Sequence, residues 1–323
     1  MTVCVAAICE KGNFIVGTSD RMVTVGGGET SYEGTKPKKI SITSAVEVLI
    51  AGDIGLNLEI ASKVRSSISD LKANDANESV TVEYVAELYQ NCFTGIRTKR
   101  AEAAILSPLA LDLDSFHQNQ DRYVCEKFAN YQMPEIEAII TGIDNSGAHL
   151  YLASNSFYQS SGRYMEIENF DSAGYLIIGI GKNHAESEFM FQGFSSDFNI
   201  SDTLLLTYIA KRRAEKSLGV GQHTDIFICG NAQLKPDTWS SVYLGKTIVP
   251  NLSTIYDIMR LEEENARVQA SVNMLEFVAE RFKSAFDEKI TRDIVIGEKQ
   301  ENTVKEKTAG KTRKQRADNK KQI

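Results

Sequence analysis

The second residue of the chain has a side chain that could act as a nucleophile. The chain begins MTVCVAAIC, and Met1 is usually removed when a small residue follows it. Removal leaves Thr2 with a free α-amine beside its own hydroxyl. An α-amine has a reference pKa of about 7.7–8.0, so it can accept the hydroxyl proton near neutral pH and activate the oxygen for attack on a carbonyl carbon. The alternative is that Thr2 only begins a strand.

Metal and nucleotide chemistry receive no support from the sequence. The five cysteines are scattered without a CxxC pair, and none of the four histidines falls in an HExxH pattern. The segment GIGKNHA (179–185) lacks the GxxxxGK[ST] spacing of a phosphate loop, and VGGGET (25–30) lacks the GxGxxG order. We therefore expect a chemistry that needs no metal and no cofactor.

The residues that follow Thr2 have the pattern of β-strands. Small and apolar residues alternate in TVCVAAIC (2–9), EKGN supplies a turn, and FIVGTSD (14–20) resumes the pattern, which predicts a hairpin. After a Gly-rich loop, KPKKISI (36–42) and AVEVLIAGD (45–53) predict two further strands. The first fifty or so residues are thus predicted to form four strands of one antiparallel sheet.

Helical and strand patterns then follow one another along the chain. Apolar residues at helical spacing predict helices over residues 56–71 and 82–100, while residues 101–133 predict a strand or loop followed by more helix. Strands are predicted in IEAIITGID and AHLYLAS, joined by a DNSG turn, and in YLIIGIG and TDIFICGN, with a helix capped by Ser201 before the last of these. This order predicts an α+β domain and not a βαβ repeat.

A resemblance to a known family becomes specific when these segments are taken together. The segments that carry it occur in one order over about residues 2 to 230. They are TVCVAAI, SDRMVT, KPKKISI, IAGDIG, AIITGID followed by GAHLYL, IGIGKNHA and AKRRAEKSLGVGQHTDI. In order and spacing they resemble the proteasome β-subunit and HslV-type family of N-terminal-nucleophile (Ntn) hydrolases, as a divergent bacterial-type member. No single motif carries this resemblance; the collinearity of the segments does.

The resemblance implies a fold and a set of catalytic residues. The fold is a four-layer αββα sandwich whose first strand begins at a catalytic threonine. Thr2 corresponds to the nucleophile, Asp20 to the family's aspartate, Lys39 to its lysine, and Gly52 to the glycine whose amide lines the oxyanion hole. A nearby positive charge favours the deprotonated hydroxyl, and an oxyanion-hole donor is typically worth about 3 kcal/mol in rate.

Two positions depart from the family pattern. Ile180 stands where the family commonly has a serine between two glycines, and it cannot form a hydrogen bond through its side chain. Near KSLGVGQ the family's aspartate is missing, so that Ser217 is the nearest candidate. Cys4 lies two residues beyond Thr2 on the same face of the first strand, and we interpret it as a pocket-lining or small apolar residue.

Two functions are consistent with these residues. The first is a threonine peptidase or amidohydrolase that cuts a peptide or protein substrate through an acyl-enzyme on Thr2 and works in a homo-oligomer, with a ring as one arrangement. The second is a catalytically silent member of the family that serves in assembly or as a scaffold. The sequence contains no docking motif that would identify an unfoldase partner.

The remainder of the chain sets its domain organisation. We predict a proteasome-like domain over residues 2–248, a C-terminal helical extension over 250–297, and a disordered tail over 298–323. Residues 301–323 carry eight Lys or Arg and three Asp or Glu, but nucleic-acid binding is not expected, because such a tail more often only aids solubility. No apolar run reaches the roughly 20 residues that a membrane span needs, so we expect a cytoplasmic protein with no membrane partner.

Overall fold

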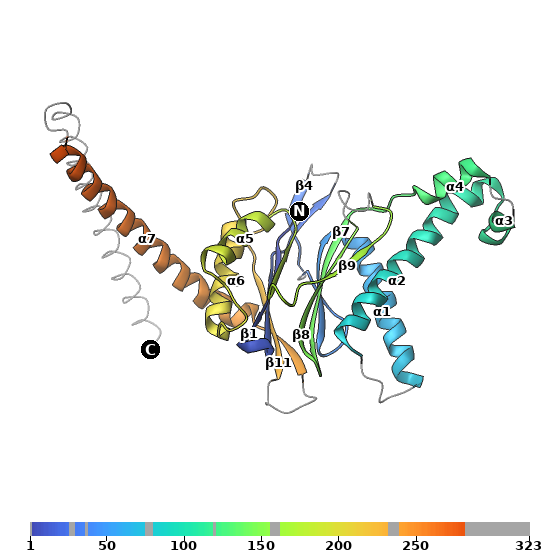
Figure 1. Ribbon diagram of the computed structural model, residues 1–323, viewed down its shortest axis with the longest axis horizontal. Helices are drawn as coiled ribbons and strands as arrows, with labels where there is room; N and C mark the ends of the chain where they lie inside the picture. The colour runs from blue at the N-terminus through green and yellow to red at the C-terminus, as the bar shows by residue number, and fades with distance from the viewer. Residues whose placement is uncertain are drawn as a thin grey trace. The chain divides into compact units, whose positions relative to one another are not determined.

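Two five-stranded antiparallel sheets form the centre of the first of two compact units, Met1–Val249 and Pro250–Ile323, in the computed structural model (Figure 1). The structure describes residues 2–25, 30–35, 38–74, 80–118, 121–155, 162–231 and 239–281. The first sheet has the order β10 (Tyr175–Ile178), β1 (Cys4–Cys9), β2 (Phe14–Ser19), β11 (Asp225–Asn231), β12 (Trp239–Tyr243). The second has the order β5 (Lys39–Ser41), β6 (Val46–Gly52), β7 (Ile136–Asp144), β8 (Gly147–Ser154), β9 (Glu166–Asn169).

Alternating side chains give each of these sheets two buried faces. In β1, Cys4, Ala6 and Ile8 point into the core between the two sheets, whereas Val5 and Ala7 point into a core on the outer face. In β6 the side chains of Leu49 and Ala51 belong to the core between the sheets, and those of the alternate residues to the other outer core. Because successive side chains of a strand point to opposite faces, strands buried on both sides need apolar residues at every position.

Helices cover the outer face of each sheet (Figure 1). On the second sheet these are α1 (Ile54–Asn74) and α2 (Val82–Ala101), and on the first sheet α5 (Lys182–Phe191) and α6 (Ile200–Ala214). The chain is therefore of the α+β class, as predicted, and the helices predicted over 56–71 and 82–100 are confirmed.

The residue that caps α6 differs from the prediction. Asn199 is the N-cap, and its side chain accepts a hydrogen bond of 2.8 Å from the backbone N–H of Asp202. The Asn199 amide in turn donates to the Asp202 carboxylate over 2.8 Å. This reciprocal pair places the helix start at Ile200, so Ser201 lies inside the first turn and the prediction that it caps the helix is wrong.

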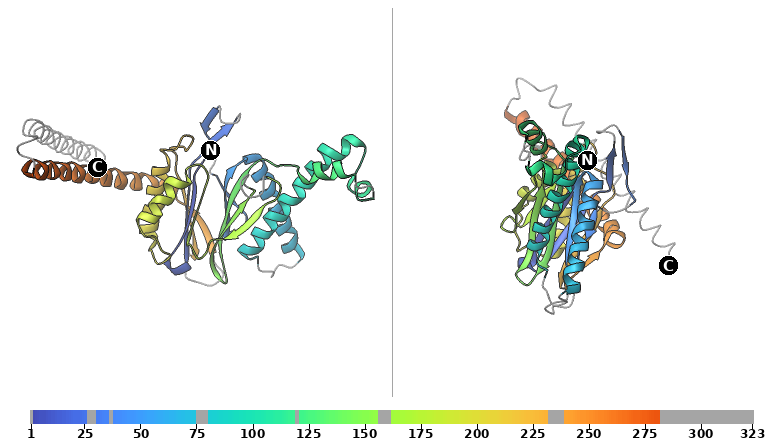
Figure 2. Two further views of the ribbon diagram at one scale, coloured as in Figure 1. Left: turned by 45° about the horizontal axis from the view of Figure 1, so that its top comes forward. Right: turned by 90° about the vertical axis from the view of Figure 1, so that its right-hand side faces the viewer.

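The first fifty residues do not form a single sheet. The hairpin of β1 and β2 is confirmed, but β5 and β6 pair in the other sheet, because β10 occupies the free edge of β1 and β11 that of β2. Between them the chain forms a separate hairpin of β3 (Met22–Val25) and β4 (Thr30–Glu33). This hairpin projects from the end of the two sheets at which the N-terminus lies (Figures 1 and 2).

The segment after α2 is helical where the structure describes it. A π-helical turn (Glu102–Leu106) and a 3₁₀ turn (Ser107–Leu109) lead to α3 (Leu113–Gln118) and α4 (Arg122–Ala129). Within 101–118 and 121–133 there is no strand. Of the two alternatives predicted for the start of this segment the strand therefore does not occur, and the helix predicted after it is confirmed.

The second unit begins inside a long helix. Helix α7 (Gly245–Arg281) starts five residues before Pro250, where the sequence predicted a helix only after that proline. The rest of the predicted extension, beyond 281, and the predicted tail over 298–323 lie outside the described residues. Among the described helices, none combines the length and the apolar character that a bilayer crossing requires.

Candidate active site

Thr2 lies two residues before the start of β1 and is held by the turn that follows β10. The backbone N–H of Gly181 donates to the Thr2 carbonyl oxygen over 3.3 Å. Gly179 has φ +88°, and a Cβ at this position would lie 2.4 Å from the same oxygen. The turn can therefore approach Thr2 this closely only because residue 179 is a glycine. The Thr2 side chain is buried, with the residue 2% exposed.

The Thr2 hydroxyl donates a hydrogen bond to the carboxylate of Asp20. Asp20 follows β2 and is fully buried. Its Oδ1 also accepts from the Val3 backbone N–H over 3.2 Å, and the Lys38 ammonium lies 3.4 Å from the same oxygen. A buried carboxylate requires this kind of compensation, because desolvation of an unpaired charge is costly.

The second oxygen of Asp20 is held by backbone groups from two other segments. Met22 N–H donates to Oδ2 over 3.2 Å, and Gly221 N–H donates over 2.8 Å from the loop after α6. Asp20 is thus fixed by groups from four parts of the chain. Its position relative to Thr2 is set by contacts from distant parts of the chain together with the local contact to Met22.

The lysine at the site is Lys38, and not Lys39 as the sequence analysis assigned. The Lys39 ammonium lies 2.5 Å from the buried Glu47 carboxylate and 3.2 Å from the Ser241 hydroxyl, in the space between the sheets. Neighbouring residues of an extended chain point in opposite directions, so only one of the two lysines can face Asp20. The structure brings together Thr2, Asp20 and Lys38, and it leaves Lys39 in a separate ion pair.

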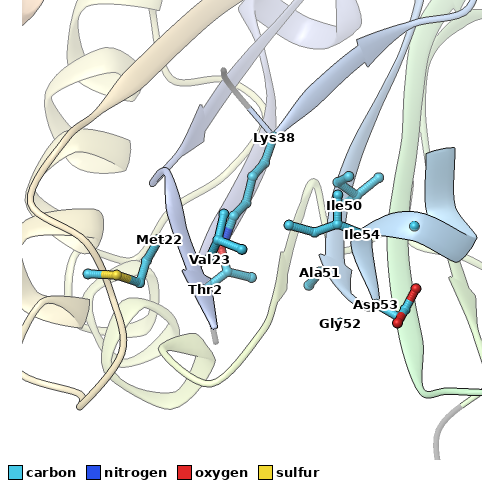
Figure 3. Close-up of a pocket in the computed structure, with 10 residues that line it drawn as sticks. Thr2, Met22, Val23, Lys38, Ile50, Ala51, Gly52, Asp53 and Ile54 are labelled. Atoms are coloured by element: carbon cyan, nitrogen blue, oxygen red, sulfur yellow. The ribbon is translucent and has the colours of Figure 1, made fainter. Parts of the chain in front are cut away.

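A cavity of about 220 Å³ opens beside Thr2 (Figure 3). The tip of the Lys38 side chain lies next to Thr2 on one side of it, while Gly52 and Asp53 lie on the other. The ten lining residues are Thr2, Met22, Val23, Lys38, Ile50, Ala51, Gly52, Asp53, Ile54 and Gly55. The cavity therefore has the hydroxyl and the ammonium on one side and Asp53 on the other, and it is also lined by the apolar residues Met22, Val23, Ile50 and Ile54.

Gly52 must be a glycine for a conformational reason. It has φ +81°, and a Cβ built on it would lie 2.3 Å from the carbonyl oxygen of Glu135. Both the left-handed backbone and the close approach of β7 exclude a side chain at this position. The structure thus brings Gly52 to the wall of the cavity that faces Thr2, which is where the sequence analysis expected a backbone donor.

Cys4 is a packing residue between the two sheets. Its thiol donates to the Ile50 carbonyl oxygen over 3.5 Å, and it is absent from the cavity lining. Burial raises the pKa of the Cys4 thiol to about 12. Because the thiolate and not the thiol is nucleophilic, Cys4 is held in its unreactive form.

The two positions at which the sequence departs from the family pattern lie on segments that contact the site through their backbones. The Ile180 side chain is 55% exposed. Of the glycines on either side of it, Gly179 packs against Thr2 and Gly181 donates a hydrogen bond to the Thr2 carbonyl oxygen. Ser217 lies in the loop after α6, where its carbonyl oxygen accepts from Val220 N–H over 3.3 Å. The neighbouring Gly221 supplies the donor to Asp20. Neither Lys38 nor Gly221 was identified from the sequence.

No protein-family model matches the sequence, and no curated protein matches it significantly. Among the described residues there is also no group of three or more His, Cys, Asp or Glu side chains arranged to hold a metal ion. The function is therefore inferred from the geometry of four residues, Thr2, Asp20, Lys38 and Gly52.

Proposed function

We propose that the protein is a threonine-type peptidase or amidohydrolase of the proteasome-like Ntn class, with Thr2 as its nucleophile after removal of Met1. The observation that carries the proposal is the convergence of the Thr2 hydroxyl, the Asp20 carboxylate and the Lys38 ammonium at one end of a cavity whose opposite wall includes Gly52. The order of helices, sheet, sheet and helices agrees with the αββα sandwich that the sequence resemblance implies.

The first step is attack by the Thr2 hydroxyl oxygen on the carbonyl carbon of a substrate amide. The free α-amine of Thr2 accepts the hydroxyl proton, and the positive charge of Lys38 favours the oxygen in its deprotonated form. Asp20 orients both groups, because its Oδ1 accepts from the hydroxyl and pairs with the ammonium.

The second step is collapse of the tetrahedral intermediate. Its oxyanion is directed to the cavity wall at Gly52, where a backbone N–H stabilises the developing charge. The α-ammonium of Thr2 returns its proton to the leaving amine, and an ester forms between the acyl group and the Thr2 oxygen. Water, activated by the same amine, then hydrolyses this ester and restores the enzyme.

The walls of the cavity favour an apolar substrate side chain. Met22 and Val23 come from β3, and Ile50 and Ile54 from the end of β6 and the start of α1. A peptide or protein substrate fits this chemistry.

A cytoplasmic homo-oligomer, in a ring or another closed arrangement, would enclose such sites. The mass of the protein in solution, measured by light scattering, tests the oligomer: a monomer mass would contradict it.

The test of the activity is the intact mass of the protein before and after treatment with a peptide epoxyketone. This reagent forms a ring adduct only with a free N-terminal amine and an adjacent hydroxyl. We expect loss of Met1 and one adduct in the wild type, and no adduct in Thr2→Ala. Retention of Met1, or a trimmed chain that never forms the adduct, would favour the catalytically silent scaffold instead, which the exposed apolar Ile180 beside the site also fits.

A further inference from the structure

Glu137 joins the two sheets at the end where the candidate site lies. It is the second residue of β7 and pairs with Ala51, the residue before Gly52. Its Oε2 accepts a hydrogen bond of 2.9 Å from the backbone N–H of Gly179, which follows β10 in the other sheet. One carboxylate therefore links the strand beside Gly52 to the turn beside Thr2.

The turn that Glu137 contacts is the one that holds the nucleophile. Gly179 lies against Thr2 so closely that a Cβ would meet the Thr2 carbonyl oxygen at 2.4 Å and its Cγ2 at 2.8 Å. Two residues later Gly181 N–H donates to the same carbonyl oxygen. Displacement of Gly179 would therefore displace the backbone of Thr2.

The start of the same strand also supports the opposite wall of the cavity. The Glu135 carbonyl oxygen accepts from Asp53 N–H over 3.0 Å and lies where a Cβ on Gly52 would be. Residues 135–137 thus contact Gly52 and Asp53 through the backbone, and they reach the Thr2 turn through the Glu137 side chain. The distance between the nucleophile Thr2 and the oxyanion donor Gly52 therefore depends on these contacts.

We infer that Glu137 is a positioning residue, which fixes the distance between Thr2 and Gly52 by holding the Gly179 turn in place. This inference rests on the proposed function. An error of about 1 Å between reacting groups can reduce the rate by about 100-fold, so a single bond between the two sheets at this point is sufficient to affect catalysis.

The ionisation of Glu137 should make the strength of its bond to Gly179 depend on pH. Burial raises the pKa of Glu137, and the Gly179 N–H and the Lys182 ammonium partly oppose this effect, whereas the neighbouring Glu135 carboxylate adds to it. The buried Cys4 thiol also faces this carboxylate. An ionised carboxylate accepts a stronger hydrogen bond than a neutral carboxyl group. The bond to Gly179 therefore weakens as the pH falls through the raised pKa.

The experiment compares the epoxyketone modification of wild type, Glu137→Ala and Glu137→Gln, with Glu166→Gln as the control. Glu166 lies on the edge strand β9 of the same sheet, so the control makes the same change of charge away from the site. The maximal rate of adduct formation and the inhibitor concentration for half-maximal rate are measured separately from pH 5 to pH 8. Thermal unfolding shows whether each variant is folded.

We expect Glu137→Ala to lower the maximal rate by about 10- to 100-fold with little change in the half-maximal concentration. Glu137→Gln keeps an acceptor oxygen, so it should retain most of the rate at pH 7.5. Its decline at acid pH should be smaller than that of the wild type, because protonation of the Thr2 α-amine lowers the rate in both proteins and protonation of Glu137 lowers it in the wild type alone. A merely structural role would not change the pH profile in this way. The Glu166→Gln variant should behave as wild type.

Hydrogen exchange at the Gly179 amide tests the same contact without any need for activity. Protection should fall in Glu137→Ala and persist in Glu137→Gln. If Glu137→Ala proves too unstable to assay, the pH profile of Glu137→Gln remains the test. Wild-type rates and pH profiles in both Glu137 variants would overturn the positioning role while the adduct itself upheld the proposed function. Absence of any adduct on the wild type would instead overturn the proposed function, and the inference with it.

Discussion

The Lys38 ammonium lies 3.4 Å from the Asp20 carboxylate, and both side chains are buried. Removal of one partner of a buried pair leaves the other charge uncompensated, which typically costs about 3–5 kcal/mol of stability. This pair differs from a structural ion pair in one respect: Asp20 also accepts the hydroxyl proton of Thr2 in a hydrogen bond. Substitution of Lys38 or of its neighbour Lys39 therefore tests whether the charge beside Thr2 is needed for reactivity.

We predict that Lys38→Ala abolishes epoxyketone modification, whereas Lys39→Ala retains it. Both changes should destabilise the protein, since Lys39 pairs with Glu47, whose side chain is 1% exposed. Of these two lysines, Lys38 is the one whose positive charge lies next to the Thr2 hydroxyl, and its loss should lower the rate by about 100-fold or more. The measurement is the rate of adduct formation at a temperature where both variants are folded. Loss of reactivity in Lys39→Ala alone would restore the assignment made from the sequence.

Gly52→Ala should destabilise the protein beyond the usual effect of a glycine substitution. A non-glycine residue in the left-handed region costs about 1–3 kcal/mol, and the added Cβ would also meet the Glu135 carbonyl oxygen at 2.3 Å. The control is Gly55→Ala in α1, where the nearest atom lies at 3.4 Å and an alanine favours the helix. Urea unfolding should therefore move the two midpoints in opposite directions. Equal midpoints would contradict the backbone geometry described for Gly52.

Glu33 should contribute stability that is lost in acid. Its carboxylate accepts from the backbone N–H groups of Gln222 and His223, at 2.5 and 3.0 Å, and pairs with the His223 ring. Burial alone would raise the pKa of Glu33, but these donors outweigh it and lower the pKa. A lowered pKa means that the contribution is present above the pKa of the unfolded chain and disappears as the pH falls through the folded value.

The corresponding measurement is urea unfolding of wild type and Glu33→Gln between pH 7 and pH 3. We expect the variant to be less stable by about 1–2 kcal/mol at pH 7, with the difference shrinking below about pH 4.5, near the pKa of an unperturbed glutamate. The exposed Glu126, which pairs with Arg122 on α4, provides a control with a small effect. A difference that stays constant with pH would show that the Glu33 charge is not involved.

Cysteine alkylation should separate the buried thiols from the others. Burial raises the pKa of Cys4, Cys9 and Cys229 to about 12 in each case, so iodoacetamide at pH 8 should leave them unmodified in the native protein. Cys92 and Cys125 are partly exposed and should react first. Peptide mass spectrometry before and after unfolding gives the answer. Rapid native alkylation of Cys4 would show a thiolate beside Thr2 and would contradict its role as a packing residue.

Most strands and most helices could be predicted because their patterns are local, although β3, β4, β9 and β12 were not identified. Alternation in β1 and β2 and helical spacing in α1 and α2 are properties of short segments. The cap of α6 was also readable, since Asn199 and Asp202 have the spacing of a reciprocal pair, although Ser201 offered a competing candidate. What could not be predicted was that β1 and β2 lie in one sheet and β5 and β6 in the other. This division depends on distant strands, β10 and β11, which pair with the edges of β1 and β2.

The site was predicted in part for the same reason. Thr2, Asp20 and Gly52 could be placed from a collinear pattern; in the structure Thr2 and Gly52 line one cavity, and Asp20 accepts a hydrogen bond from Thr2. The choice between Lys38 and Lys39 depends on which way an extended chain faces as it enters β5, and a shift of one residue reverses that. Gly221 contributes a backbone N–H to Asp20. Every residue except proline has such a group, so the residue type does not indicate this role.

The bond between Gly221 and Asp20 joins residues 201 positions apart, and this separation has a consequence during synthesis. The carboxylate that orients Thr2 is fully held only when the loop after α6 is in place, so a nascent chain that has not yet emerged past residue 221 has an N-terminal hydroxyl without its complete set of partners. Contacts of such long range form late in folding. Under the proposed function, the protein would therefore gain its hydrolytic activity only when its first unit is nearly complete, which protects the ribosome-bound chain and its neighbours from premature cleavage.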